Sequence, residues 1–174
     1  RCFKLPPELS RKSIHVSLGL VCLSFPWLFD RFWPVGLLCL ASIGVLLWLR
    51  RQKGDLNAVL HSVSRDSWGE LCFPLAVAVL FLLKQEPVSD YLIPLLLLTL
   101  ADAAGALIGV RYGQSKYSTD ESFKSREGSL AFFLTAFICT HICLLLGTAT
   151  GRAESLLMAA IIGLLVMLIE GISR

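Results

Sequence analysis

Residues suited to phosphate chemistry are concentrated between positions 102 and 129. The segment begins with Asp102, an acidic residue in an apolar stretch, and ends with Lys-Ser-Arg-Glu-Gly-Ser at 124–129. An Asp at mid-membrane costs about 2.5 to 3.5 kcal/mol, so a carboxylate in a membrane segment needs a reason to persist. The order of acid, glycines, lysine and a Lys-Ser-x-Glu-Gly-Ser cluster at a helix start favours a phosphate-handling site.

The polar run 111–129 supplies both positive charge and hydrogen-bond donors. Its cations could bind polyphosphate, and three of its residues could offer hydroxyl or backbone N–H groups: Arg111, Lys116, Lys124 and Arg126, then Ser125, Gly128 and Ser129. Ser125 or Ser129 would also suit the N-cap of the helix that follows. The alternative is that these cations only obey the positive-inside rule, and charge count alone does not reject it. No Walker A or protein-kinase glycine loop occurs, so a nucleotide site here needs another architecture.

Glycines follow the acidic residue at helical spacing. Gly105, Gly109 and Gly113 recur every four residues after Ala101, so one helix face carries small residues next to Asp102. Such a ladder is most simply explained by close helix packing, and it also permits a homodimer. Because Asp102 lies beside the ladder and packing needs no carboxylate, Gly109 and Gly113 are alternatively candidates for nucleotide binding. For Asp102 the structural alternative is a salt bridge to a neighbouring helix.

The elements that must position these residues are membrane helices. The 174 residues are 55% hydrophobic and 17% charged, with a mean hydropathy of +0.70, which is far more apolar than an ordinary soluble domain. We predict an all-α fold, a polytopic transmembrane helix bundle forming a single integral membrane domain over 1–174. Hydropathy places its six spans at 14–29, 32–49, 68–83, 91–110, 130–146 and 156–169.

The distribution of Lys and Arg predicts the orientation of these spans. From the first segment outside the spans to the last, their numbers alternate as 4, 1, 4, 1, 4, 1 and 1. Because short cytoplasmic loops carry such residues in excess, both ends and the two long loops are predicted to be cytoplasmic. The run 111–129 then becomes a cytosolic nucleotide-binding loop. The net charge of +3 follows from this topology, and no nucleic-acid partner is expected.

The sequence contains six cysteines, and neither end of the chain resembles a natural terminus. No Cys-x-x-Cys pair occurs and most cysteines lie in apolar spans, so we interpret them as small hydrophobic residues. The chain opens without Met and stops soon after Glu170. We therefore expect it to be a fragment, with further residues at either end.

The motifs resemble a known family. Asp-Ala-Ala-Gly-Ala-Leu-Ile-Gly-Val-Arg-Tyr-Gly-Gln-Ser-Lys at 102–116 and Lys-Ser-Arg-Glu-Gly-Ser-Leu-Ala at 124–131 closely resemble the signature of the polyprenol kinase family. That family includes phytol, farnesol and dolichol kinases and CTP-dependent diacylglycerol kinases. Arg-Lys-Ser-Ile-His at 11–15, Gly-Glu at 69–70 and Glu-Gly-Ile-Ser at 170–173 resemble weaker family elements. The Asp-Asn-x-x-x-Pro stretch expected after the last element is absent, and the length is closest to phytol kinases.

This resemblance implies transfer of the terminal phosphoryl group of CTP, or another NTP, to a membrane lipid alcohol such as phytol, farnesol or a polyprenol. It implies Mg²⁺ or another divalent cation as cofactor. Lys116 and Lys124 would clamp phosphate oxygens, and the turn 125–129 would cradle them. Asp102 would hold the metal or accept the proton of the alcohol, and Glu127 competes with it for either role.

Further polar residues are expected at the same membrane edge. Glu70, Asp102 and Glu170 could converge on one metal–nucleotide site, although Glu70 could equally be a first-turn acid favoured by the helix dipole. Arg11 and His15 lie one helical turn apart at the start of the first span. For His15, an interfacial histidine without a role in the site is an equal alternative.

Three other functions stay open at this point. A CTP-dependent diacylglycerol kinase would use the same donor on another lipid alcohol. An enzyme resembling CTP:phosphatidate cytidylyltransferase would instead make a CDP-lipid. A membrane transporter or scaffold would use Asp102 for ion coupling, although no internal repeat supports this.

Overall fold

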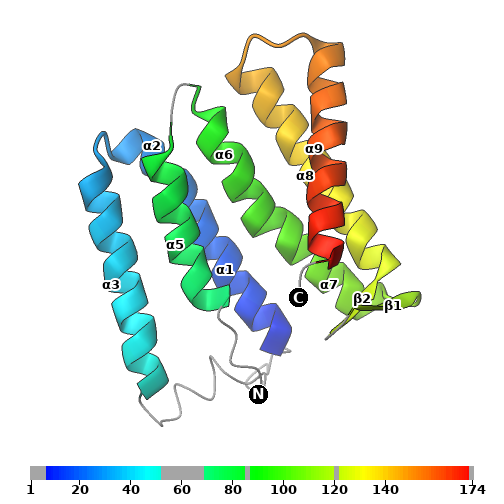
Figure 1. Cartoon of the computed structure of the whole chain (residues 1–174), viewed down its shortest axis with the longest axis horizontal. Helices are drawn as coiled ribbons and strands as arrows, with labels where there is room; N and C mark the ends of the chain where they lie inside the picture. Colours follow the sequence, from blue (N-terminus) through cyan, green and yellow to red (C-terminus); the bar gives the residue numbers. More distant parts are fainter. Residues whose placement is uncertain (1–6, 52–68, 85–86, 120–121, 173–174) are drawn as a thin grey trace, which may run out of the picture. The chain divides into compact units, whose positions relative to one another are not determined.

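The computed structural model describes residues 7–51, 69–84, 87–119 and 122–172, and most of them are helical (Figure 1). The all-α prediction is confirmed. The chain divides into two compact units, Arg1–Lys84 and Gln85–Arg174, which are described separately below.

The first unit contains α1 (Pro7–Leu23), α2 (Phe25–Leu28), α3 (Phe32–Arg51) and α5 (Gly69–Leu82). Ser24 separates α1 from α2, where its hydroxyl donates to the carbonyl of Val21 and Pro26 lies at the start of α2. The helices α3 and α5 pack together. The unit buries apolar side chains from both helices, among them Val35, Cys39, Phe73 and Val77.

The second unit is organised around α8 (Arg126–Gly147). One side of α8 contacts α6 (Ser89–Leu96), η1 (Leu97–Ala101) and α7 (Asp102–Tyr112), which run as one continuous helix, and α8 also packs along α9 (Arg152–Ile172). The core between these helices contains Leu97, Ala101, Phe132 and Ala136, with Ile162 and Val166 packed against it.

The segment η1 is a π-helical turn inside the long helix. The backbone N–H of Asp102 donates to the carbonyl of Leu97, five residues earlier. Two local features favour this departure from α geometry. Pro94 supplies no N–H, and the hydroxyl of the fully buried Thr99 donates to the carbonyl of Leu95 at 2.7 Å, in competition with the regular ladder. The turn ends where Asp102 begins α7.

A two-stranded hairpin joins α7 to α8, where the sequence predicts only a loop. Strand β1 (Lys116–Thr119) pairs antiparallel with β2 (Ser122–Ser125), so that Lys116 lies opposite Ser125 and Tyr117 opposite Lys124. The predicted loop 111–129 is therefore shorter than expected, because Arg111 still belongs to α7 and α8 begins at Arg126.

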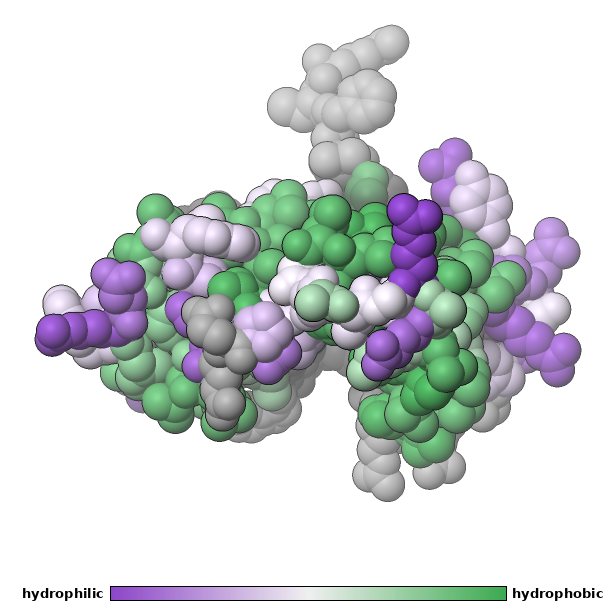
Figure 2. Space-filling model, turned by 90° about the horizontal axis from the view of Figure 1, so that it is seen from above, coloured by the Kyte–Doolittle hydropathy of each residue, from purple (hydrophilic) through white to green (hydrophobic). Residues whose placement is uncertain are grey.

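Within the described residues, three helices are long and apolar enough to cross a membrane: Ser89–Tyr112, Arg126–Gly147 and Arg152–Ile172. The three other predicted spans correspond to the shorter apolar helices Lys12–Leu28, Phe32–Trp48 and Leu71–Leu82. Large apolar side chains such as Leu134, Ile138, Leu164 and Leu168 are exposed, and Figure 2 shows hydrophobic surface with hydrophilic groups between its parts. Exposed apolar surface of this extent fits a membrane protein.

Candidate functional site

Glycines let α7 and α8 approach closely. A Cβ atom on Gly128 would lie 2.8 Å from the carbonyl oxygen of Gly105 and 3.1 Å from Cα of Gly109. A Cβ atom on Gly113 would lie 2.7 Å from Cβ of Ser125. Of the two explanations that the sequence left open for the glycines, helix packing accounts for these contacts directly. The crossing brings the end of α7 against the start of α8.

The start of α8 is capped as the sequence predicted. Ser125 has extended backbone angles, and its hydroxyl accepts a hydrogen bond from the backbone N–H of Gly128 at 3.1 Å. The backbone N–H of Arg126 donates to the carbonyl of Ser115 at 3.0 Å. These two donors of the 125–129 turn are therefore engaged inside the chain, and a phosphate bound to them would have to displace their present partners.

Glu127 fastens the segment before the hairpin to the first turn of α8. Its carboxylate accepts a hydrogen bond from the backbone N–H of Ser115, at 3.1 Å to Oε1. Glu127 precedes the apolar stretch 130–146 that the sequence predicts to span the membrane. Its own backbone N–H and that of Ser115 favour the ionised form and lower the pKa of the carboxyl group. A lowered pKa suits an anchoring anion better than a general base that must take up a proton.

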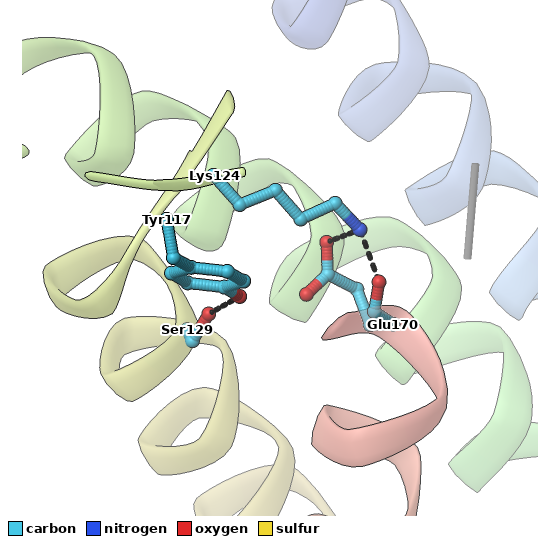
Figure 3. Close-up of polar contacts among 4 residues, drawn as sticks. All are labelled: Tyr117, Lys124, Ser129 and Glu170. Atoms are coloured by element: carbon cyan, nitrogen blue, oxygen red, sulfur yellow. Dashed lines mark hydrogen bonds and ion pairs between the residues drawn. The ribbon is translucent and has the colours of Figure 1, made fainter. Parts of the chain in front are cut away.

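The hairpin is also attached to two helices through its side chains (Figure 3). Lys124 Nζ lies 2.9 Å from Glu170 Oε1 and also donates to the backbone carbonyl of Glu170, in the last turn of α9. The hydroxyl groups of Tyr117 and Ser129 lie 2.7 Å apart. The structure thus brings together Lys124 and Glu170, which the sequence assigned to phosphate and to metal.

Three further cations surround this region, and all are exposed. Arg111 lies in the last turn of α7, Lys116 begins β1 and Arg126 begins α8. The guanidinium of Arg111 lies 5.4 Å from the ring centre of Tyr112. Exposed cations around one short hairpin leave their charges accessible to a polyphosphate in solution.

Asp102 is half-buried and begins α7 directly after the π-helical turn. Such turns occur frequently at functional sites, and this one is absent from the sequence prediction. Tyr117 was also missed, because its contact with Ser129 depends on the hairpin. Its position opposite Lys124 would have been a signal only if the strands had been recognised.

The remaining predicted residues belong to the first unit. The ring of His15 meets that of Phe73 edge to face, with centroids 4.5 Å apart. The side chains of Arg11 and Glu70 lie outside the described part of the structure. Among the described side chains, no three His, Cys, Asp or Glu residues are grouped so that they could hold a metal ion. The predicted set of Asp102, Glu70 and Glu170 therefore stays a prediction.

Comparison with curated proteins finds a similar protein. Phytol kinase from Synechocystis sp. is 30% identical over 142 residues. The similarity supports a polyprenol or phytol kinase-like family. The aligned residues cover 80% of this chain and 60% of the Synechocystis protein, so the chain spans less than two thirds of that relative. No family model matches the chain, and no solved structure does so.

Proposed function

We propose that this protein is an integral membrane kinase that transfers the terminal phosphoryl group of CTP to a prenyl alcohol such as phytol. The observation that carries the proposal is the similarity to phytol kinase over 80% of the chain. The arrangement of charge supports it. A lipid alcohol would lie among the apolar helices, and its hydroxyl must meet the nucleotide where exposed cations are available.

In this proposal the polyphosphate binds at the hairpin end of the second unit. Lys116, Arg111 and Arg126 are exposed and reach it without breaking a buried contact. Lys124 projects from the opposite face of the hairpin to Lys116, because Lys124 pairs with Tyr117 and Lys116 pairs with Ser125. It reaches the polyphosphate at the end of the hairpin after exchanging its present partner. Since phosphoryl transfer depends chiefly on positioning and on neutralising charge, a group of cations suits the reaction.

Asp102 is the candidate for the remaining chemistry. Its carboxylate offers the oxygen ligand that Mg²⁺ prefers, and Mg²⁺ is commonly held by one or two carboxylates together with substrate phosphates. The residues present therefore fit the cation without a preformed group of three ligands. Mg²⁺ would neutralise charge on the phosphates. Asp102 alternatively accepts the proton of the alcohol, a role for which Glu127 is less suited because its carboxylate binds Ser115.

We place the amino-terminus and the hairpin on the cytoplasmic side, where nucleotides are available. The alternating distribution of Lys and Arg supports this orientation. Cysteine labelling of intact cells at Lys116→Cys, in a background without the native cysteines, tests it. Modification by a membrane-impermeant reagent before lysis would contradict the orientation.

The function is tested by a crossed assay on the purified protein with Mg²⁺. Each of four NTPs labelled at the γ-phosphorus is combined with phytol, farnesol, a polyprenol and diacylglycerol. We expect label from CTP in a prenyl phosphate. In a parallel assay with CTP labelled at the α-phosphorus, label in lipid would instead indicate a cytidylyltransferase. Preference for diacylglycerol over the prenyl alcohols would indicate a CTP-dependent diacylglycerol kinase.

The substitution Asp102→Asn tests the role of Asp102 in phosphoryl transfer. We expect transfer to fall at least about 100-fold, within the range that general acid–base groups contribute. Asp90→Asn is the control, because Asp90 is an exposed acid in the first turn of α6, within the same long helix. Full activity of Asp102→Asn would refute the assigned role, and no transfer from any NTP to any alcohol would refute the kinase.

A further inference from the structure

One face of the hairpin is fastened to two helices by side chains that lie directly opposite each other. Tyr117 and Lys124 are cross-strand partners, so both project from the same face of the two strands. Tyr117 reaches Ser129 in α8, while Lys124 reaches Glu170 in α9 (Figure 3). Gly171 lies beside this face, since a Cβ atom on it would lie 3.7 Å from the Tyr117 hydroxyl oxygen, an ordinary van der Waals distance. We call these residues, Tyr117, Lys124, Ser129 and Glu170, the hairpin joint.

Stabilisation of the C-terminus of α9 explains only some of the contacts in the hairpin joint. A cation at a helix C-terminus is favourable, because it offsets the dipole and can donate to the last carbonyl groups. Lys124 does this through the carbonyl of Glu170. A carboxylate in the same turn is unfavourable with respect to the dipole. Helix capping by Lys124 therefore gives no reason for an acidic side chain at position 170.

The carboxylate does have a consequence for charge. It neutralises Lys124, one of the cations proposed to bind polyphosphate, and its oxygen takes a hydrogen bond from the ammonium group for which a phosphate oxygen would compete. The side chains of Lys124 and Glu170 retain 19% and 30% exposure, so water and anions can reach the pair. Because neither side chain is fully buried, a bound anion can replace Glu170 on Lys124 without leaving a charge in a dry interior.

We propose that Lys124 and Glu170 form a latch that a polyphosphate opens. In the closed state Glu170 holds Lys124 on the end of α9. When a triphosphate binds, its oxygens replace Glu170 on Lys124, and β2 separates from the last turn of α9. The hydrogen bond between the hydroxyl groups of Tyr117 and Ser129 keeps the hairpin attached to α8 while the latch is open. This inference rests on the proposed function in one respect, since it takes a nucleoside triphosphate as the anion.

The first test measures binding of inorganic tripolyphosphate to the purified protein by calorimetry, in EDTA so that no divalent metal contributes. Glu170→Gln keeps the size of the side chain and an acceptor for Lys124 but removes the competing charge. We expect it to bind tripolyphosphate about two- to fivefold more tightly than the wild type, the range set by the weakness of exposed ion pairs. Glu154→Gln is the control, because Glu154 is exposed in the first turn of the same helix.

The second test needs no variant. Once Lys124 leaves, the last turn of α9 loses a hydrogen-bond donor, so its amides should exchange hydrogen for deuterium faster when tripolyphosphate is added to the wild type. In Glu170→Gln the added tripolyphosphate should change this exchange less. Unchanged or weaker binding by Glu170→Gln would overturn the latch, and so would unchanged or slower exchange in the wild type.

The two tests separate the latch from the kinase. Neither test requires phosphoryl transfer. If both responses are seen but no alcohol is phosphorylated, the latch proposal stands and the proposed function is refuted. If phytol is phosphorylated but Glu170→Gln leaves tripolyphosphate binding unchanged, the proposed function stands and the latch proposal is refuted.

Discussion

Gly128→Ala tests whether the glycines serve helix packing. The added Cβ would lie 2.8 Å from the carbonyl oxygen of Gly105, 3.0 Å from Ser125 Oγ and 3.1 Å from Cα of Gly109. Two of these atoms are backbone, so neither can be relieved by a side-chain rotation. Overpacking of this kind costs about 1 to 3 kcal/mol.

The helical preference of Ala offsets part of this loss. Replacing Gly by Ala within a helix gains about 0.5 to 1 kcal/mol. The net loss is therefore roughly 0 to 2.5 kcal/mol, which lowers Tm by up to about 10 °C for a chain of this size. Thermal unfolding in detergent, followed by far-ultraviolet circular dichroism, measures the shift, because the four tryptophans all lie in the first unit and Gly128 lies in the second.

Gly44→Ala is the matched control, because Gly44 lies within α3 and a Cβ atom on it would meet nothing within 4 Å. It gains only the helical preference, so its Tm should rise by about 1 to 4 °C. The two substitutions thus have opposite expected signs. A Tm for Gly128→Ala that rises as much as that of Gly44→Ala would refute the packing argument and return the glycine to a role in nucleotide binding alone.

Two further predictions concern the segment between α7 and α8. A double-mutant cycle of Tyr117→Phe and Ser129→Ala should give a coupling of about 0.5 to 1.5 kcal/mol in unfolding free energy, as expected for their 2.7 Å hydrogen bond, and additive effects would contradict that bond. Because the folded pKa of Glu127 is lowered, its stabilising effect is present above the ordinary pKa of 4.5 and is lost as the pH falls through the folded value. The Tm difference between wild type and Glu127→Gln should therefore shrink from pH 7 to pH 3.5, and a constant difference would contradict the role of the charge.

The long helices and the capped start of α8 could be predicted because each has a local signal. Sustained hydropathy marks α8 and α9, and Ser125 precedes an apolar run at the position where an N-cap is expected. The candidate phosphate-binding segment also has a local signal, since residue types and their order between 102 and 129 indicate it.

The π-helical turn and the hairpin have no comparable signal. The run 95–100 is leucine apart from Thr99, so one extra residue in a turn leaves no trace in its hydrophobic periodicity. The strands β1 and β2 have four residues each, too few to show alternation. Lys124 and Glu170 are 46 residues apart, and only the packing of α8 against α9 brings them together.

Packing and phosphate binding are therefore not competing explanations for the glycines. Gly113 at the end of α7 meets Ser125 at the start of α8, and this contact closes the segment 114–124 into a loop whose two ends touch. A segment held in this way must fold back on itself, which the pairing of β1 with β2 achieves. Lys116 and Lys124 lie in that segment, so the absence of side chains at the helix crossing is what brings the two cations to the same end of the second unit. A larger residue at position 113 would separate the helix ends and the two strands with them.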